Sequence, residues 1–199
     1  TMINANSPGC VLVTGAAGYL GSQLLAALAR TPPSGGVVAV DVRDFPAERR
    51  LPGIDYCTAD VRSPELEALF RSKRPRIVVH LASIVTPGKD SNREFEYSVD
   101  VLGTENVLKA CLAAGVEKIV VTSSGAAYGY HADNPAWIGE DWPVRGNEAF
   151  AYAHHKRLVE EMLARWRSRH PELKQVVLRV GTILGATVRN QITDLFEKP

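Results

Sequence analysis

The stretch Val11–Gly21, VLVTGAAGYLG, decides the fold of this 199-residue chain. Its first part belongs to an apolar run from Cys10 to Thr14, which predicts a short buried strand. From Tyr19 onward, leucines recur at helical spacing. A strand, a tight glycine turn and a helix N-terminus form an anion site, because free backbone N–H groups and the helix dipole both favour phosphate.

Three glycines in this stretch have separate uses in a dinucleotide site. Gly15 permits the turn, Gly18 lets the backbone approach a pyrophosphate, and Gly21 allows the helix to pack closely on the strand. The first two glycines are three residues apart, one more than in the usual G-x-G-x-x-G pattern. Taken alone, the motif also fits an ordinary glycine-rich turn.

A carboxylate at the end of the next predicted strand strengthens the dinucleotide interpretation. That strand, Val37–Val40, leads into Asp41, which lies 20 residues after Gly21. An acidic residue at this place binds the ribose hydroxyls of adenosine. It also repels a 2′-phosphate, so the sequence favours NAD over NADP as cofactor, although Arg43 nearby softens that preference.

Composition predicts a soluble globular protein, with 45% hydrophobic and 23% charged residues. The length predicts one domain over residues 1–199. A formal net charge of +1 argues against nucleic acid or a membrane surface as partner, and the basic stretches Arg71–Arg76 and Arg165–His170 are interpreted as solvated surface. The sequence shows neither a membrane-length apolar run nor a signal peptide, so the expected location is the cytoplasm. The three cysteines fit no metal-binding spacing, and we expect buried free thiols and no metal.

Predicted strands and helices alternate along the chain. Further strands are expected at 54–57, 77–81, 118–122 and 175–180, and helices from 63 to about 71, from about 94 to 114, and from 151 to about 166. Apolar strands of this kind imply a parallel sheet buried on both faces. We therefore predict an α/β fold of the Rossmann type, a doubly wound parallel sheet with helices on both faces.

Ser124, Tyr152 and Lys156 are the candidate catalytic residues. Ser124 follows the fifth predicted strand at its carboxyl end, where ligands bind in open α/β sheets. Tyr152 and Lys156 lie four residues apart on a predicted helix and therefore share a face. A tyrosine pKa of about 10 is high for a base near neutrality. An adjacent ammonium and a positive nicotinamide ring both favour the phenolate.

In this interpretation Tyr152 takes the proton of a substrate alcohol while hydride leaves for the nicotinamide, or returns it in reverse. Ser124 hydrogen-bonds the substrate oxygen as charge develops there, and Lys156 holds the nicotinamide ribose. A Tyr-x-x-x-Lys pair taken alone is more often an ordinary surface pair. The glycine loop, Asp41 and the serine at a strand end together favour the catalytic interpretation.

With these residues in view, the chain resembles the extended short-chain dehydrogenase/reductases, the NAD-dependent epimerase/dehydratase family, from Val11 to about Gly185. The motifs that carry the likeness are Thr14–Gly21, Asp60-Val61, His80–Ser83, Gly103–Val107 and Ser123–Gly129. The resemblance implies cofactor binding by Gly15, Ala17, Gly18, Tyr19, Leu20, Asp41, Asp60, Val61, Leu81, Ala82, Ser83, Tyr152 and Lys156. It also implies catalysis by Ser124, Tyr152 and Lys156, with Asn106 as the supporting asparagine.

The chain departs from the family pattern at several positions. Asp100 stands where the family commonly has asparagine before Val-x-Gly-Thr. After the sixth predicted strand there is no Tyr-Gly-Pro, which counts against a UDP-sugar substrate. His154 and His155 replace the small residues often found between the catalytic tyrosine and lysine. We expect both to be exposed on the helix, and the alternative is that His155 reaches the site.

Family members usually continue into a small substrate-binding lobe. We therefore expect residues 10–185 to be the family-like core and 186–199 to begin a truncated lobe. Two function classes remain open. One is an NAD-dependent oxidoreductase acting on a small molecule at a secondary alcohol or ketone, with nucleotide-sugar epimerases and dehydratases as variants that recycle the hydride. The other is a non-catalytic dinucleotide sensor. Homodimers are common among proteins that resemble this one.

Overall fold

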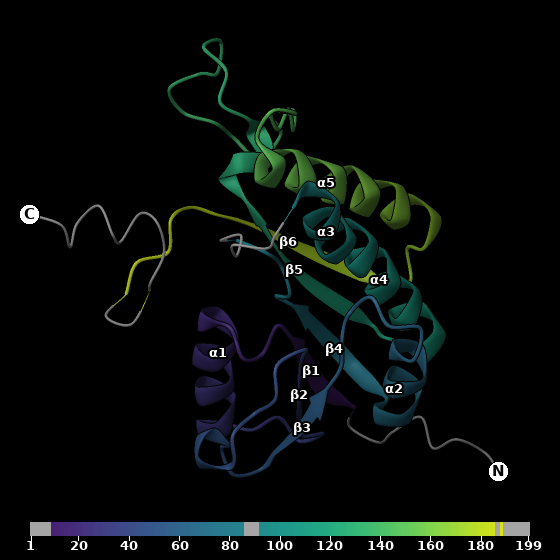
Figure 1. The fold of residues 1–199 in the computed structure, drawn as a ribbon. Helices are drawn as coiled ribbons and strands as arrows, with labels where there is room; N and C mark the ends of the chain where they lie inside the picture. Colours follow the sequence, from purple (N-terminus) through teal and green to yellow (C-terminus); the bar gives the residue numbers. More distant parts are fainter. Residues whose placement is uncertain (1–8, 86–91, 186–187, 189–199) are drawn as a thin grey trace, which may run out of the picture.

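The computed structural model describes residues 9–85, 92–185 and 188. Within these residues, six strands form one parallel sheet in the order β3-β2-β1-β4-β5-β6 (Figure 1). The strands are β1 Cys10–Thr14, β2 Val37–Asp41, β3 Ile54–Thr58, β4 Pro75–His80, β5 Lys118–Ser124 and β6 Lys174–Val180. The strand order reverses between β1 and β4, and ligands of such sheets bind in the crevice at this switch point.

Helices cover both faces of the sheet, as predicted. They are α1 Tyr19–Arg30, α2 Leu66–Lys73, α3 Arg93–Tyr97, α4 Gly103–Ala114 and α5 Ala151–Arg169. Helices α2, α4 and α5 pack on one face, and α1 packs on the other (Figure 1). The Rossmann-type doubly wound fold is confirmed, and the expected lobe at 186–199 lies outside the described residues except for Val188.

The helix predicted from 94 to 114 is interrupted. A π-helical turn, η2 Ser98–Leu102, joins α3 to α4 and buries Asp100 and Val101. Gly115 ends α4 with a left-handed φ of +70°, which suits the residue without a Cβ. The helix that was predicted to begin at Ser63 begins later in the chain. The carbonyl and hydroxyl oxygens of Ser63 accept hydrogen bonds within a turn that precedes α2.

Two apolar clusters hold the layers together. The larger lies between the sheet and helices α2, α4 and α5, where Phe70, Leu108 and Leu163 are fully buried. The smaller joins α1 to β1 and β2. The cysteines are free, with Cys10 and Cys111 buried and Cys57 half-buried, so the expected thiols largely lie in the interior.

The basic stretch before β4 lies at the surface, as expected. Arg71, Lys73 and Arg76 each pair with a carboxylate, at N–O distances of 2.9, 2.6 and 2.9 Å. Exposed pairs of this kind contribute about 0–1 kcal/mol each. Among the described residues, no helix combines the length and apolar character needed to cross a bilayer.

The larger cluster predicts which aromatic side chain matters for stability. Phe70 is 0% exposed and Trp137 is 92% exposed. We expect Phe70→Ala to lower the free energy of unfolding by about 3–5 kcal/mol, because it leaves a cavity. The control Trp137→Ala should change it by less than about 0.5 kcal/mol. Urea denaturation followed by circular dichroism measures both. Equal effects would contradict the assignment of the core.

Candidate functional site

The predicted functional segments meet at one edge of the sheet. Because all six strands are parallel, their carboxyl ends share that edge. The glycine loop follows β1, Asp41 ends β2, Asp60 follows β3, the segment 81–83 follows β4, and Ser124 ends β5. Residues far apart in the sequence are thus neighbours in space, on both sides of the switch point between β1 and β4.

The glycine loop packs against the segment that follows β4. Gly15 has a φ of +68°, and a Cβ at this position would lie 2.5 Å from the amide nitrogen of Ala82. The amide of Leu81 donates to the Thr14 carbonyl at 3.1 Å. A Cβ at Gly21 would overlap the Gly15 carbonyl oxygen. The loop is therefore closed on one side by backbone, and glycine is required at both positions.

The start of α1 has the properties of a pyrophosphate site. Within the described residues, α1 begins at Tyr19 after Gly18 as N-cap, without a side-chain cap and without an acidic residue in its first turn. The first amides of a helix have no intrahelical acceptor, so those of Tyr19 and Leu20 are available to an anion. Arg43 adds positive charge, because its Nη2 lies 3.9 Å from the position that a Cβ of Gly18 would take. The residues present fit a diphosphate.

Asp41 has a role that the sequence did not indicate. Its buried carboxylate accepts a hydrogen bond from the Ala17 amide at 2.9 Å through Oδ2. Oδ1 accepts from the Arg43 amide at 3.0 Å and from the Arg43 Nε at 3.1 Å. The carboxylate that was predicted to bind ribose therefore also braces the glycine loop, and Arg43 compensates its charge.

The pair predicted to contact adenine lies after β3. Asp60 forms an ion pair with Arg62 at 2.6 Å, and this hydrogen bond lowers the pKa of the Asp60 carboxyl. Val61 is buried. Arg62 also donates to the Ser98 hydroxyl at 3.1 Å and thus connects this loop to η2.

Ser124, Tyr152 and Lys156 come together as predicted. The Ser124 hydroxyl lies near enough to the Tyr152 phenol to lower the pKa of that phenol, and it accepts from the Ala126 amide at 3.1 Å. The Lys156 ammonium donates to the Ser83 hydroxyl at 3.0 Å and to the Thr122 carbonyl at 3.3 Å. Its Nζ lies 5.5 Å from the centroid of the Tyr152 ring. A phenol, an ammonium and two hydroxyls therefore share the edge that carries the glycine loop.

Burial outweighs the activation of Tyr152 that was expected from its cationic neighbour. Burial raises the pKa of the phenol, the nearby Ser124 hydroxyl opposes this effect, and the charge of Asp100 raises the pKa further. The net pKa lies above the ordinary value. Tyr152 is therefore a neutral phenol near pH 7 in this structure, and the expected phenolate needs more positive charge than Lys156 supplies.

Asn106 does not join this group, which corrects the expectation of a catalytic role. Its side-chain amide donates to the carbonyl oxygens of Val61 and Ser63, both at 2.8 Å. Asn106 therefore fastens α4 to the loop after β3. The π-helical turn instead brings Asp100 to the buried region around Lys156. Burial raises the pKa of the Asp100 carboxyl there, and the lysine charge opposes that rise.

His155 is buried, so the expectation that it is exposed is wrong. It is 1% exposed, whereas His154 is half-buried. The helical pattern contained the signal, because His155 lies three residues after Tyr152 and four before Val159, on the face that packs inward. The chemical character of histidine had argued for the surface.

The sequence did not predict a second network of hydrogen bonds, which lies close to Ser124, Tyr152 and Lys156. The Arg179 guanidinium pairs with Glu160 at 2.7 Å and donates to the Tyr128 hydroxyl at 2.7 Å and to the Glu140 carbonyl at 2.6 Å. The Ser123 hydroxyl donates to Glu160 at 2.5 Å. These bonds fasten α5 and the loop after η3 Gly125–Tyr128 to the ends of β5 and β6. The signal for this network in the sequence was Arg179 itself, a single arginine in an apolar strand.

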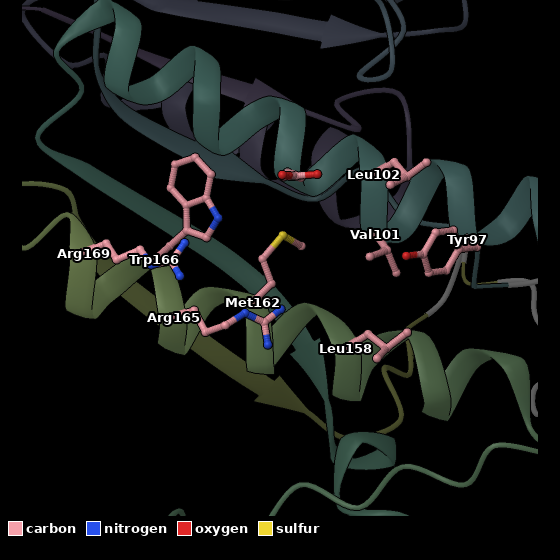
Figure 2. A pocket seen from close by; sticks show the side chains of 9 residues that line it. Tyr97, Val101, Leu102, Leu158, Met162, Arg165, Trp166 and Arg169 are labelled. Carbon is pink, nitrogen blue, oxygen red and sulfur yellow. The ribbon is translucent and has the colours of Figure 1, made fainter.

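A hollow on the molecule lies away from this edge. It sits between α4 and α5 and is lined by Tyr97, Val101, Leu102, Glu105, Leu158, Met162, Arg165, Trp166 and Arg169 (Figure 2). Within the described part of the chain, none of these lining residues belongs to the predicted site. We therefore place the candidate site at the strand ends and not in this hollow.

Comparison with known proteins agrees with this geometry. A family model described as "NAD dependent epimerase/dehydratase family" matches residues 11–198. The chain is 35% identical over 181 residues to a UDP-glucose 4-epimerase of Azospirillum brasilense, covering 88% of this chain and 49% of that protein. It is 28% identical to the yeast sterol-4-alpha-carboxylate 3-dehydrogenase ERG26, decarboxylating, covering 93% of this chain and 54% of that protein. The chain thus spans about half the length of the curated relatives it matches.

Solved structures give the same result. The UDP-glucose 4-epimerase of Thermus thermophilus in complex with NAD is similar with a TM-score of 0.71 and 33% identity, covering 85% of this chain and 54% of that chain. MoeE5 in complex with UDP-glucose and NAD is similar with a TM-score of 0.75 and 32% identity, covering 91% and 57%.

The close approach of Gly15 to Ala82 can be tested by adding one methyl group. We expect Gly15→Ala to lower the free energy of unfolding by about 3 kcal/mol or more, because left-handed strain and backbone overlap add. Gly53 is the matched control, since its φ is +75° and no heavy atom lies within 4 Å of an added Cβ. Gly53→Ala should cost about 1–2 kcal/mol. Equal losses in urea denaturation would argue against the close approach.

Proposed function

The chain belongs to the NAD-dependent epimerase/dehydratase family, and we propose on this basis that it binds NAD and supports reversible hydride transfer at a secondary alcohol or ketone carbon of a small molecule. The observation that carries the proposal is the assembly of Ser124, Tyr152 and Lys156 at the strand ends. A protein that only binds dinucleotide does not need all three, so the intact group favours an enzyme over a sensor.

In this proposal, different residues at the strand ends bind different parts of the dinucleotide. The loop amides and the start of α1 hold the pyrophosphate, and Asp41 holds the adenosine ribose. Asp60 and Val61 lie on the adenine side. The segment 81–83 and Lys156 lie on the nicotinamide side, beyond the switch point. NAD, when bound, supplies the hydride acceptor and donor.

Tyr152 is the proposed acid and base of the reaction. During oxidation its phenolate accepts the proton of the substrate hydroxyl, and during reduction the phenol returns it. Ser124 hydrogen-bonds the same oxygen, and Lys156 stabilises the phenolate. Because the phenolate forms only as pH rises through the Tyr152 pKa, oxidation should increase with pH through that range and reduction should decrease. Burial places this range above the ordinary tyrosine value in the structure described here.

A second reaction class is favoured by the names of the relatives. Relatives and solved neighbours include UDP-glucose 4-epimerases, and MoeE5 was solved with UDP-glucose and NAD. In epimerisation or dehydration the hydride returns to the same substrate, so no NADH accumulates. The same trio serves both outcomes, because the proton transfer at Tyr152 is common to them.

NAD titration followed by a substrate panel tests the proposal. Saturable NAD binding is expected, and its failure would overturn the proposed function. NADH that accumulates with an alcohol indicates a dehydrogenase, whereas substrate conversion without NADH indicates an epimerase or dehydratase. The panel is run with the complete gene product. Saturable binding without turnover of alcohols, ketones or nucleotide sugars would overturn the enzyme assignment in favour of a sensor.

The role of Tyr152 predicts a separation of turnover from binding. Tyr152→Phe should lower kcat by about 10²–10⁴-fold, because it removes the proton donor and acceptor. NAD affinity should stay within a few fold, since the ring remains. Tyr130→Phe is the matched control, because Tyr130 is exposed and carries the same hydroxyl. Steady-state kinetics and NAD titration measure the two quantities. A parallel loss of turnover and NAD affinity would contradict the role.

The pairing of Asp41 with Arg43 predicts how cofactor choice changes. Asp41→Asn removes the charge that repels a 2′-phosphate and frees the Arg43 guanidinium. We expect the ratio of NAD to NADP affinity to fall by at least about tenfold, equivalent to 1.4 kcal/mol. Asp44→Asn is the control, because Asp44 is exposed and pairs with Arg50. Titration with both cofactors measures the ratio, and an unchanged ratio would refute the role of Asp41.

A further inference from the structure

Three ionisable side chains are buried together beside Tyr152. Asp100 is 2% exposed, His155 is 1% exposed and Lys156 is 5% exposed. Lys156 belongs to the proposed catalytic group, but Asp100 and His155 have no place in it. Both are departures from the family pattern on the sequence, where asparagine and small residues are usual. A buried carboxylate and a buried imidazole are costly unless they have partners.

The two side chains face each other with unused hydrogen-bonding atoms. Asp100 Oδ1 accepts from the Ile84 amide at 2.9 Å, whereas Asp100 Oδ2 has no partner among the described residues. His155 Nδ1 also has no partner there, and it lies 3.9 Å from Asp100 Oδ2. This separation is too long for a hydrogen bond, yet a small side-chain rotation closes it. A buried polar atom without a partner is destabilising, so closure is favoured.

The carboxylate of Asp100 also connects to Lys156 through Ser83. The Ser83 hydroxyl accepts from the Lys156 ammonium at 3.0 Å. The Ser83 side chain also opposes the rise that burial causes in the pKa of the Asp100 carboxyl. Ser83 and Ile84 are consecutive residues after β4. Asp100 therefore helps to hold this segment against α5. His155, which belongs to α5, lies next to Asp100.

Charge balance favours a neutral His155. Burial lowers the pKa of its imidazole. The negative charge of Asp100 is already balanced by the positive charge of Lys156 nearby. The other charged and titratable groups that face His155 are Glu96 and Arg93 from α3 and His154 from α5. Lys156 additionally faces Glu160 and the buried His80. The Tyr97 ring, which also lines the hollow of Figure 2, packs on His155 with centroids 5.8 Å apart.

We propose that Asp100 and His155 form a buried hydrogen-bonded pair, Nδ1–H to Oδ2, whose negative charge positions Lys156 beside Tyr152. Both are positioning residues, because neither reaches a reacting atom. The consequence for Tyr152 rests on the proposed function. The hydrogen bond itself does not depend on it.

The sign of the effect on Tyr152 follows from the charges. A carboxylate beside a phenol disfavours the phenolate and raises its pKa. Asp100→Asn removes that charge and keeps an oxygen for the Ile84 amide. The midpoint of Tyr152 ionisation should therefore move to lower pH by about one unit. His155→Phe should move it in the same direction, because the carboxylate loses its donor and is less stable as an anion. His155→Gln retains a donor and should stay near the wild-type midpoint.

Nitrogen-15 NMR of the imidazoles tests the hydrogen bond without any cofactor. In the wild-type chain, His155 should carry its proton on Nδ1, and Asp100→Asn should change the Nδ1 chemical shift. His155 is assigned by comparison with His155→Gln, and His154→Gln is the control on the same helix. A wild-type His155 with its proton on Nε2 and a bare Nδ1 would overturn the proposal. The assignment needs only one folded variant without histidine at position 155, and His155→Phe serves where His155→Gln fails to fold.

Carbon-13 NMR of labelled tyrosine in the NAD-saturated chain tests the link to Tyr152. The Tyr152 signal is assigned with Tyr152→Phe, and its titration midpoint is compared in wild type, Asp100→Asn, His155→Phe and His155→Gln. Midpoints that do not differ between wild type and Asp100→Asn would overturn the electrostatic link. A wild-type chain that does not bind NAD would overturn the proposed function, while the imidazole measurement would still decide the existence of the pair.

Discussion

The close contact between the glycine loop and the segment after β4 is the constraint on which the rest of the site depends. Gly15 lies against Ala82 so tightly that a Cβ would be 2.5 Å from the Ala82 nitrogen. The next two residues, Ser83 and Ile84, bind Lys156 and Asp100. The short segment 82–84 therefore lies between the glycine loop on one side and α5 on the other, and contacts both. The diphosphate site is thus joined by a backbone contact to the segment whose Ser83 hydroxyl binds the lysine of the catalytic group.

Burial of charge on α5 is the second feature that shapes the site. Lys156 and Glu160 lie one turn apart and are both buried. Lys156 is held by Ser83 and the Thr122 carbonyl, while Glu160 is compensated by Arg179. Their separate partners keep the two charges in fixed places. His80, whose pKa burial lowers to about 3, stays neutral near Lys156 and joins the hydroxyls of Thr14 and Thr104 at 2.7 and 3.0 Å.

The strands and the trio could be predicted because local signals and fold rules agree. Apolar runs bounded by glycine or proline located the strands to within a few residues, and the parallel arrangement then placed Ser124 at the common edge. Tyr152 and Lys156 needed only their spacing on a helix. What the sequence did not reveal depends on contacts between distant elements. The bracing of the glycine loop by Asp41 and the network of Arg179 are of this kind.

Asp100 and Asn106 show a subtler failure. Helical periodicity assumes hydrogen bonds between residues four apart, but in the π-helical turn η2 they span five and accommodate one extra residue, so the sequence pattern before and after it is out of phase. The family motif implied a catalytic role for Asn106, which follows η2. Its side chain instead binds the loop after β3. His155 was misjudged for a different reason, because a polar residue on the inward face is buried only when a partner such as Asp100 lies opposite.

The wide turn between α3 and α4 also has a consequence for how this region tolerates length changes. Deleting one residue within Ser98–Leu102 would let the chain form an uninterrupted α-helix, which local hydrogen bonding favours. A π-helical turn accommodates one extra residue while the flanking helices keep their orientation, so α3 and α4 would stay close to their present positions after such a deletion. The Tyr97 ring would keep its place against His155, but the turn would lose one of its five side chains, of which Asp100 and Val101 are the buried ones. A shortened helix here would be locally more regular, at the expense of the side chains that the turn carries into the interior.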